Sequence, residues 1–141
     1  MKHVKSQLHI CSVNCQGLRQ YEKRLQLYMW AKHQRSDILM LQETHFSDDD
    51  NTDFQHESDF NMFYSNGTKQ SKGVAILINK NMNYKVIDIH KDNEGRCILL
   101  NIEIYDKIYT VCNIYAPNIV TSRNTFFKNV NKFISNNSMG R

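Results

Sequence analysis

A single carboxylate, Glu43, ends an expected strand whose other residues are almost all apolar. Residues 38–41 (I-L-M-L) have the length and content of a strand buried on both faces of a sheet. A carboxylate at the mouth of such a strand is costly unless a cation or a hydrogen-bond partner meets it. In open α/β sheets, binding sites collect outside the carboxyl ends of the strands. Glu43 is therefore where we expect a metal ion to bind.

Two further expected strands also end in polar side chains. Asn14 lies where a strand over residues 8–14 gives way to a glycine turn, in S-V-N-C-Q-G-L. Tyr115 and Asn118 follow a strand that ends near residue 114, around the only proline of the chain. Taken singly, an asparagine in such a place is more often a turn former, and a tyrosine before A-P is more often a packing residue. In this order, and on the one sheet edge where we expect them to meet, the three strand ends indicate a single site.

The segment between the first two strands is expected to be a helix. Residues 18–34 carry a stripe at helical spacing that we interpret as the buried face, formed by Leu18, Tyr21, Leu25, Tyr28, Met29 and Lys32. Strand, helix and strand in this order imply a right-handed crossover between two parallel strands. This arrangement puts Asn14 and Glu43 at the same end of neighbouring strands.

The rest of the chain is expected to be a polar loop, an antiparallel meander and a final helix. The loop covers residues 44–59, and its acidic run at 47–53 lacks the glycine and the terminal glutamate of an EF-hand, so we expect a solvated loop. Turn residues separate short β segments at 60–65, 74–79, 84–90, 97–104 and 108–114. Thr121 or Ser122 is expected to cap a helix that runs to about residue 134, with Phe126, Phe127, Val130 and Phe133 on one face.

Composition sets broad limits on the class of protein. The 141 residues suffice for one domain with a sizeable core, and a net charge of +4 permits, but does not require, a polyanionic partner. The four cysteines form no C-x-x-C pair, so reduced thiols are expected instead of a zinc ribbon. Neither an apolar leader nor a membrane-spanning run is present, so we expect an intracellular monomer, nuclear or cytoplasmic, with no membrane partner.

Four blocks of sequence carry a resemblance to a known family. Q-E-T-H at 42–45, G-V-A-I-L-I at 73–78, G-R-C-I at 95–98 and N-I-Y-A-P-N at 113–118 occur in this order. Together they resemble the endonuclease/exonuclease/phosphatase superfamily, and more closely its apurinic-like endonuclease domain from LINE-type retrotransposons. The resemblance spans about residues 8–135. It implies an α/β fold, a two-sheet sandwich of the DNase I-like type, with residues 1–141 forming its N-terminal part only.

The resemblance also implies a function and residue roles. The family cleaves phosphodiester bonds with a divalent ion, so Mg²⁺ is expected (Mn²⁺ is possible), with DNA as partner and no small-molecule cofactor. Glu43 and Asn14 would hold the metal ion, and Tyr115 would donate to the phosphate. Asn118, Arg96 and Tyr115 would contact the nucleic acid, with weaker candidates at Lys69 and Lys72. His45 is expected to turn away from the site.

The sequence departs from the family in two places. The strand ending in G-D-x-N and the later S-D-H block, which carry the family's remaining acids and its histidine, are both missing. We therefore expect residues 1–141 alone to be inactive, as a truncated product or a retroelement relic. Two alternatives stay open, a repair-type abasic endonuclease and a non-catalytic nucleic-acid-binding remnant.

Overall fold

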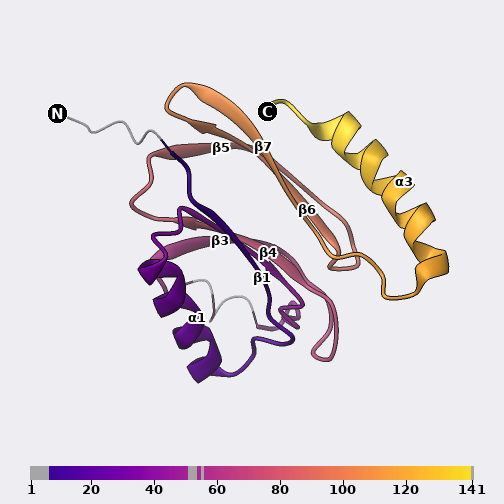
Figure 1. The fold of residues 1–141 in the computed structure, drawn as a ribbon, viewed down its shortest axis with the longest axis horizontal. Helices are drawn as coiled ribbons and strands as arrows, with labels where there is room; N and C mark the ends of the chain where they lie inside the picture. Colours follow the sequence, from indigo (N-terminus) through magenta and orange to yellow (C-terminus); the bar gives the residue numbers. More distant parts are fainter. Residues whose placement is uncertain (1–6, 51–53, 55, 141) are drawn as a thin grey trace.

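Two β-sheets pack face to face and each carries a helix on its outer side (Figure 1). The computed structural model describes residues 7–50, 54 and 56–140. The first sheet has the order β1-β2-β4-β3, from β1 (Ile10–Asn14), β2 (Ile38–Gln42), β3 (Phe60–Ser65) and β4 (Val74–Asn79). The second has the order β5-β6-β7, from β5 (Tyr84–Lys91), β6 (Cys97–Ile104) and β7 (Lys107–Ile114). The helices are α1 (Tyr21–His33) and α3 (Val120–Asn137).

The expected parallel pair is present at one edge of the first sheet. β1 runs parallel to β2, with Asn14 opposite Gln42, and α1 makes the crossover between them. The carboxyl ends of these two strands therefore lie side by side, which confirms the predicted placement of Asn14 next to the segment that carries Glu43.

The five later strands do not form the one meander that the turn residues suggested. β3 and β4 form an antiparallel hairpin, but β4 also pairs antiparallel with β2, so both of its edges are occupied. Since β4 has no free edge for β5, the chain crosses to the second sheet after Asn79. There β5, β6 and β7 form a separate antiparallel meander.

Alternation along the strands divides the core in two. Leu39, Leu41 and Leu77 face α1 in one buried cluster, whereas Ile38, Ile76 and Ile78 face the second sheet in the other. All six of these side chains are fully buried. A strand such as β2 is apolar on both faces because it lies in the middle layer. The next inward-facing residue after Ile38 and Met40 is Gln42.

The buried face of α1 differs from the predicted one. Tyr28 is buried as expected, but Tyr21, Leu25 and Met29 are 56%, 42% and 64% exposed. In their place the helix buries Arg24, which is only 4% exposed. The Arg24 guanidinium bonds both oxygens of Glu57 and lies 3.8 Å from the centroid of the Phe54 ring. A paired, stacked arginine can occupy a core position that its charge alone would forbid.

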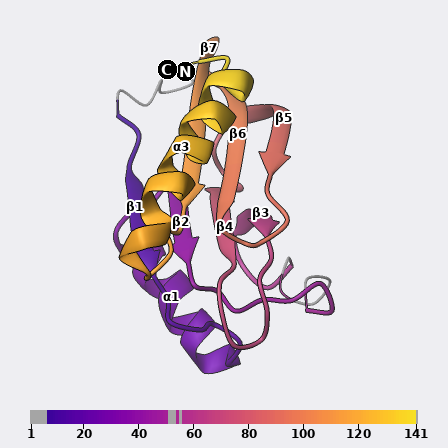
Figure 2. The same cartoon turned by 90° about the vertical axis from the view of Figure 1, so that its right-hand side faces the viewer.

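α3 covers the outer face of the second sheet (Figure 2). It begins at Val120, with Ile119 and not a hydroxyl side chain at the N-cap, and extends past the predicted end to Asn137. Val130 is buried, but Phe127 is 43% exposed and does not belong to the packed face. The buried Asn101 of β6 holds the end of the helix, because its amide donates to the Asn137 carbonyl at 2.7 Å.

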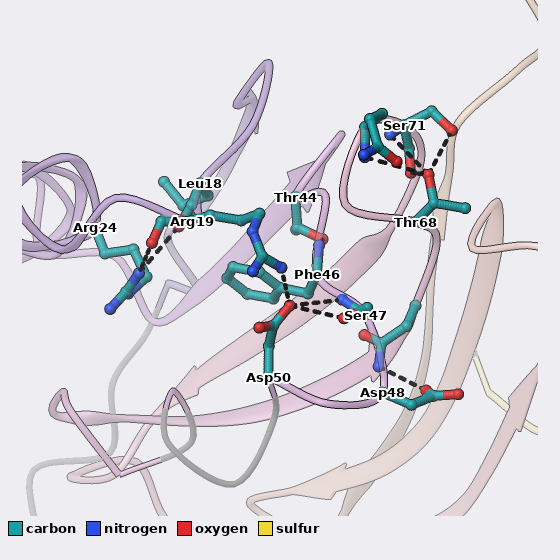
Figure 3. Close-up of polar contacts among 12 residues, drawn as sticks. Leu18, Arg19, Arg24, Thr44, Phe46, Ser47, Asp48, Asp50, Thr68 and Ser71 are labelled. Atoms are coloured by element: carbon teal, nitrogen blue, oxygen red, sulfur yellow. Dashed lines mark hydrogen bonds and ion pairs between the residues drawn. The ribbon is translucent and has the colours of Figure 1, made fainter.

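The segment after β2 is packed against the body of the protein at Phe46, whereas Asp48 and Asp49 are exposed, as expected for a solvated loop. Phe46 is fully buried, and Figure 3 shows the Asp50 carboxylate accepting from Ser47 and pairing with Arg19. Asp48 accepts a hydrogen bond from the Asn66 amide at 2.9 Å. The acidic run alone does not predict these contacts, because Arg19 and Asn66 are remote from it along the chain. Residues 51–53 of the acidic run lie outside the described residues.

In the part of the chain that the structure describes, neither α1 nor α3 combines the length and the apolar character needed to cross a membrane. All four cysteines are free thiols, as predicted, with Cys15 and Cys97 buried.

Cys15 makes the stability of the protein sensitive to alkaline pH. Burial raises the pKa of its thiol from 9.0 to about 12, since the thiolate would be poorly solvated. Between pH 9 and 12 only the unfolded chain loses this proton, so the free energy of unfolding should fall there by at most about 1.4 kcal/mol per pH unit from this group. Denaturant unfolding of the wild type and Cys15→Ala will test this: the wild type should have the steeper fall, and equal slopes would refute it.

Candidate metal and phosphate site

The ends of β1 and β2 are tied together by backbone hydrogen bonds. Beyond the last ladder pair, the Cys15 N–H donates to the Gln42 carbonyl at 2.8 Å and the Gly17 N–H donates to the Glu43 carbonyl at 2.7 Å. Gly17 has φ of +91°, and a Cβ on it would lie 2.9 Å from the His45 ring. The glycine in N-C-Q-G-L thus gives the turn both its conformation and the room to approach β2.

Glu43 has a left-handed backbone conformation, with φ of +53°. In a regular strand Gln42 and Glu43 would point to opposite faces of the sheet. Because the backbone turns at Glu43, both side chains reach the second sheet: Gln42 contacts Asn113 and Glu43 contacts Tyr115. Such a conformation costs a non-glycine residue about 1–2 kcal/mol, and backbone strain of this kind gathers at functional sites.

Tyr115 lies between Glu43 and Asn118. Hydrogen bonding with the Glu43 carboxylate and with the Asn118 side chain shifts the pKa of the phenol in opposite directions. The hydrogen bond to Glu43 is the largest cause that raises the pKa of Tyr115, followed by burial and the charge of Glu43. Asn118 and Arg96 act in the opposite direction because they favour the phenolate. The phenol is therefore held protonated, as a hydrogen-bond donor.

Arg96 is fixed beside Tyr115 by contacts in both directions. Its guanidinium donates to the Tyr115 carbonyl at 3.1 Å and lies 5.2 Å from the centroid of the Tyr115 ring. The Tyr115 N–H donates to the Arg96 carbonyl at 2.8 Å, which continues the β6–β7 ladder by one step. A carboxylate oxygen of the exposed Glu94 lies 3.9 Å from Nε of Arg96. The structure thus places the Arg96 cation next to the Tyr115 ring.

Asn14 and Asn118 sit at the rim of this group. Asn14 is exposed at the end of β1, and its side-chain oxygen (Oδ1) accepts a hydrogen bond from the Gln16 backbone N–H at 3.1 Å. Asn118 is also exposed, and Arg123 of α3 holds its turn by donating to the carbonyls of Pro117 and Asn118. The structure therefore brings Glu43, Tyr115, Asn118 and Arg96 into one group, with Asn14 on the neighbouring strand end.

The three strand ends do not share one sheet edge as predicted. Asn14 and Glu43 follow strands of the first sheet, whereas Tyr115 and Asn118 follow β7 of the second. They meet because both sheets end on the same side of the sandwich. The site therefore lies between two layers, and its geometry depends on how the layers are held together.

The weaker candidates lie on the hairpin between β3 and β4. Lys69 is exposed, and Lys72 is half-buried, with φ of +63° and its carbonyl accepting the His45 N–H at 2.9 Å. The His45 ring itself lies against Gly17. Two polar residues of the site were not singled out from the sequence, Gln42 and Asn113, although both lie in the quoted blocks. Their signal was a polar side chain on the inward face of an otherwise apolar strand.

The oxygen donors at the site fit a hard divalent cation. Mg²⁺ and Mn²⁺ prefer carboxylate, carbonyl and water oxygens, and Mg²⁺ commonly takes only one or two protein carboxylates beside water and phosphate oxygens. Glu43 supplies the carboxylate and Asn14 an amide oxygen. Among residues 7–50, 54 and 56–140, no three His, Cys, Asp or Glu side chains gather into a denser cluster. Glu43 and Asn14 therefore carry oxygen atoms of the kind that such a cation prefers.

Solved structures share this fold at low sequence identity. An AP endonuclease from Archaeoglobus fulgidus is 20% identical, with a TM-score of 0.68 over 94% of this chain and 53% of its own. The 3′ phosphatase NExo from Neisseria, bound to a product DNA hairpin, is 19% identical, with a TM-score of 0.68 over 91% and 51%. D. rerio TDP2 complexed with single strand DNA product is 13% identical, with a TM-score of 0.69 over 96% and 57%. The predicted two-sheet DNase I-like sandwich is confirmed.

The sequence itself matches a relative and a family. The Transposon TX1 uncharacterized 149 kDa protein of Xenopus laevis is 24% identical over 127 residues, which are 90% of this chain and 10% of that protein. The chain thus spans about half of the solved structures and a tenth of the transposon protein. The model of the Endonuclease/Exonuclease/phosphatase family matches residues 11–123. The chain belongs to the Endonuclease/Exonuclease/phosphatase family.

Proposed function

We propose that this chain provides the metal- and phosphate-binding part of a divalent-metal-dependent DNA endonuclease of the retrotransposon type. The observation that carries the proposal is the contact between Glu43 and Tyr115, with Asn118 and Arg96 beside it, at the strand ends where the two sheets meet. Family membership supports phosphodiester chemistry. Similarity to the transposon protein favours the retrotransposon type.

Each residue has a role that its chemistry suits. Glu43 and Asn14 would hold Mg²⁺ or Mn²⁺, which when bound neutralises charge on a phosphate oxygen. The Tyr115 hydroxyl, kept protonated by its surroundings, would donate to a phosphate oxygen as negative charge builds there, with the Asn118 amide as a second donor. Arg96, Lys69 and Lys72 would contact the phosphate backbone.

Water attack on phosphorus needs a group that orients or deprotonates the water. The G-D-x-N and S-D-H blocks that serve this purpose in the family are missing from the sequence. We therefore propose that residues 1–141 bind DNA and a divalent ion but do not cleave DNA by themselves.

Two other functions rest on specific observations. The AP endonuclease from Archaeoglobus fulgidus shares the fold, so a repair-type abasic endonuclease is the second candidate. A third candidate is nucleic-acid binding by residues 1–141 without catalysis, because these residues contain neither block. An oligonucleotide with one abasic site and its intact counterpart distinguish the first two, since only a repair-type enzyme should prefer the abasic strand.

DNA binding and plasmid nicking test the proposal. The chain should bind duplex DNA at low salt, and log Kobs should fall linearly with log salt. Lys69→Gln and Lys72→Gln should each reduce the slope by about 0.9, whereas Lys85→Gln should leave it unchanged. Lys85 is an exposed lysine at the opposite end of the sandwich, where it lies opposite Glu103 in the β5–β6 ladder.

The two possible failures are distinct. No binding at low salt would overturn the DNA function. Nicking of supercoiled plasmid in Mg²⁺ or Mn²⁺ that Glu43→Gln abolishes would support the endonuclease function and overturn the proposed inactivity of residues 1–141.

A further inference from the structure

We propose that the side-chain amides of Gln42 and Asn113 form a bridge between the two sheets that positions Glu43 against Tyr115. The inference rests on the proposed function of that site and assigns two positioning residues to it. The Gln42 side-chain amide donates to the side-chain oxygen (Oδ1) of Asn113 at 2.7 Å. Each partner stands next to a site residue in the chain: Gln42 directly precedes Glu43, and Asn113 lies two residues before Tyr115.

Asn113 uses its whole side-chain amide to join three strands. Its two N–H groups donate to the carbonyls of Leu41 in β2 and Ala75 in β4, both at 2.9 Å. Leu41 and Ala75 are register partners, so one side chain from β7 holds a rung of the first sheet. Asn113 is only 2% exposed. Reversing its amide would set its oxygen against two carbonyl oxygens, so the contacts fix its orientation.

Gln42 completes the bridge from the other side. Its amide nitrogen donates to Asn113 and also, at 3.0 Å, to the Ser12 hydroxyl of β1. With β1, β2, β4 and β7 joined through two amides, the bridge ties the parallel strand ends of one sheet to the last strand of the other. Asn113 is the buried member of this network, and all polar atoms of its side chain are hydrogen-bonded, which favours one arrangement of the strands that it joins.

The bridge lies one step inside the Glu43–Tyr115 contact. Asn113 and Tyr115 point to the same side of their strand because they are two residues apart. The left-handed turn at Glu43 lets the adjacent Gln42 and Glu43 meet them in order. The inner contact joins two neutral side chains and is part-buried, whereas the outer one involves the carboxylate and the phenol. The inner contact thus sets the separation at which the outer one forms.

Asparagine is the side chain that these contacts require at position 113. Aspartate would face two carbonyl oxygens with no donor, serine or threonine would offer one donor for two acceptors, and leucine would offer none. Residues that orient metal-site groups from behind typically change metal affinity by roughly 10- to 100-fold when removed. We expect an effect of this size here.

The test uses Gln42→Met, which keeps the length of the side chain and removes the bridge. Mg²⁺ titration followed by NMR should show roughly 10- to 100-fold weaker binding by the folded variant. Ser12→Ala is the matched control, since it removes the other acceptor of the same Gln42 amide and leaves the contact with Asn113. It should bind Mg²⁺ like the wild type. Unchanged Mg²⁺ affinity in folded Gln42→Met would overturn the proposal and reduce the bridge to a packing contact.

A double-mutant cycle gives a second readout that needs no metal. Gln42→Met and Tyr115→Phe remove atoms that do not touch each other, so a purely structural bridge predicts additive effects on stability. Positioning predicts coupling, with the unfolding equilibrium constant of the double variant at least about twofold away from the additive value. Additivity would overturn the proposal.

Two further outcomes are informative. If Gln42→Met fails to fold, the NMR signals of the side-chain amides of Asn113 and Gln42 in the wild-type protein provide the test. Both signals should shift on adding Mg²⁺, whereas the signal of the buried Asn101 side-chain amide should not. The absence of a shift at Asn113 and Gln42 would overturn the proposal. Loss of DNA binding would leave these results unchanged, because none of them involves DNA. The failure of the proposed function can therefore be told apart from that of the bridge.

Discussion

Glu43→Gln should weaken Mg²⁺ binding by at least about 100-fold, more than any other single substitution at the site. Glutamine keeps the size of the side chain but removes the negative charge, and even residues that only support a ligand typically contribute 10- to 100-fold in metal affinity. Glu43 is the only carboxylate that the structure places against Tyr115 among the described residues. No other described group there can take over its charge.

The same substitution should change Tyr115. Because the hydrogen bond to Glu43 is the main cause that raises the pKa of Tyr115, the glutamine variant should show a lower pKa for this phenol. Mg²⁺ titration by NMR, with the Tyr115 ring as reporter, measures both effects. Glu94→Gln is the control: Glu94 is 68% exposed and 3.9 Å from Arg96, and its loss should leave Mg²⁺ affinity unchanged. Equal Mg²⁺ affinities of Glu43→Gln and the wild type would show that Glu43 is not a metal ligand.

Arg24→Met should destabilise the protein by about 3–5 kcal/mol, the range expected when one partner of a buried ion pair is removed. The guanidinium donates to Glu57 and also to the carbonyls of Leu18 and Arg19. Methionine fills part of the space but leaves the Glu57 carboxylate, 15% exposed, without its cation. The cost therefore comes from the uncompensated charge and the unpaired carbonyls more than from lost packing.

A solvated ion pair on the same helix provides the comparison. Lys32 lies 4.0 Å from Asp59, and both side chains are about four-fifths exposed. Lys32→Ala should change stability by less than about 0.5 kcal/mol. Urea unfolding of the three proteins gives the free energies, and a loss below about 1 kcal/mol in Arg24→Met would show that Glu57 is solvated in the folded protein.

The strands and the strand-end residues could be predicted because their signals are local. β2 is mostly a run of apolar residues, Glu43 and Tyr115 follow their strands directly, and Asn118 lies four residues after the end of β7. The parallel pairing of β1 and β2 came from element order alone. These features need no knowledge of distant partners, and the structure confirms them.

The errors share one physical origin, since each depends on a partner far away in the sequence. Arg24 is buried because Glu57 lies 33 residues on, and this pairing turns α1 so that Leu25 and Met29 face outward. Asn113 reaches Leu41 across 72 residues. From the neighbouring sequence alone, Arg24 and Asn113 would each be predicted to lie on the surface. Division of the meander into two sheets likewise depends on β2 occupying the free edge of β4.

The left-handed backbone of Glu43 sets stability and chemistry in opposition at a single residue. Glycine adopts this conformation without the steric cost that a side chain brings. Selection of variants for thermal resistance alone would therefore favour glycine at position 43, and each such variant would lose the carboxylate. A library screened for folding should therefore accumulate glycine at position 43, whereas a library screened for metal binding should keep glutamate. The residue found at this position would then show which of the two properties had been selected.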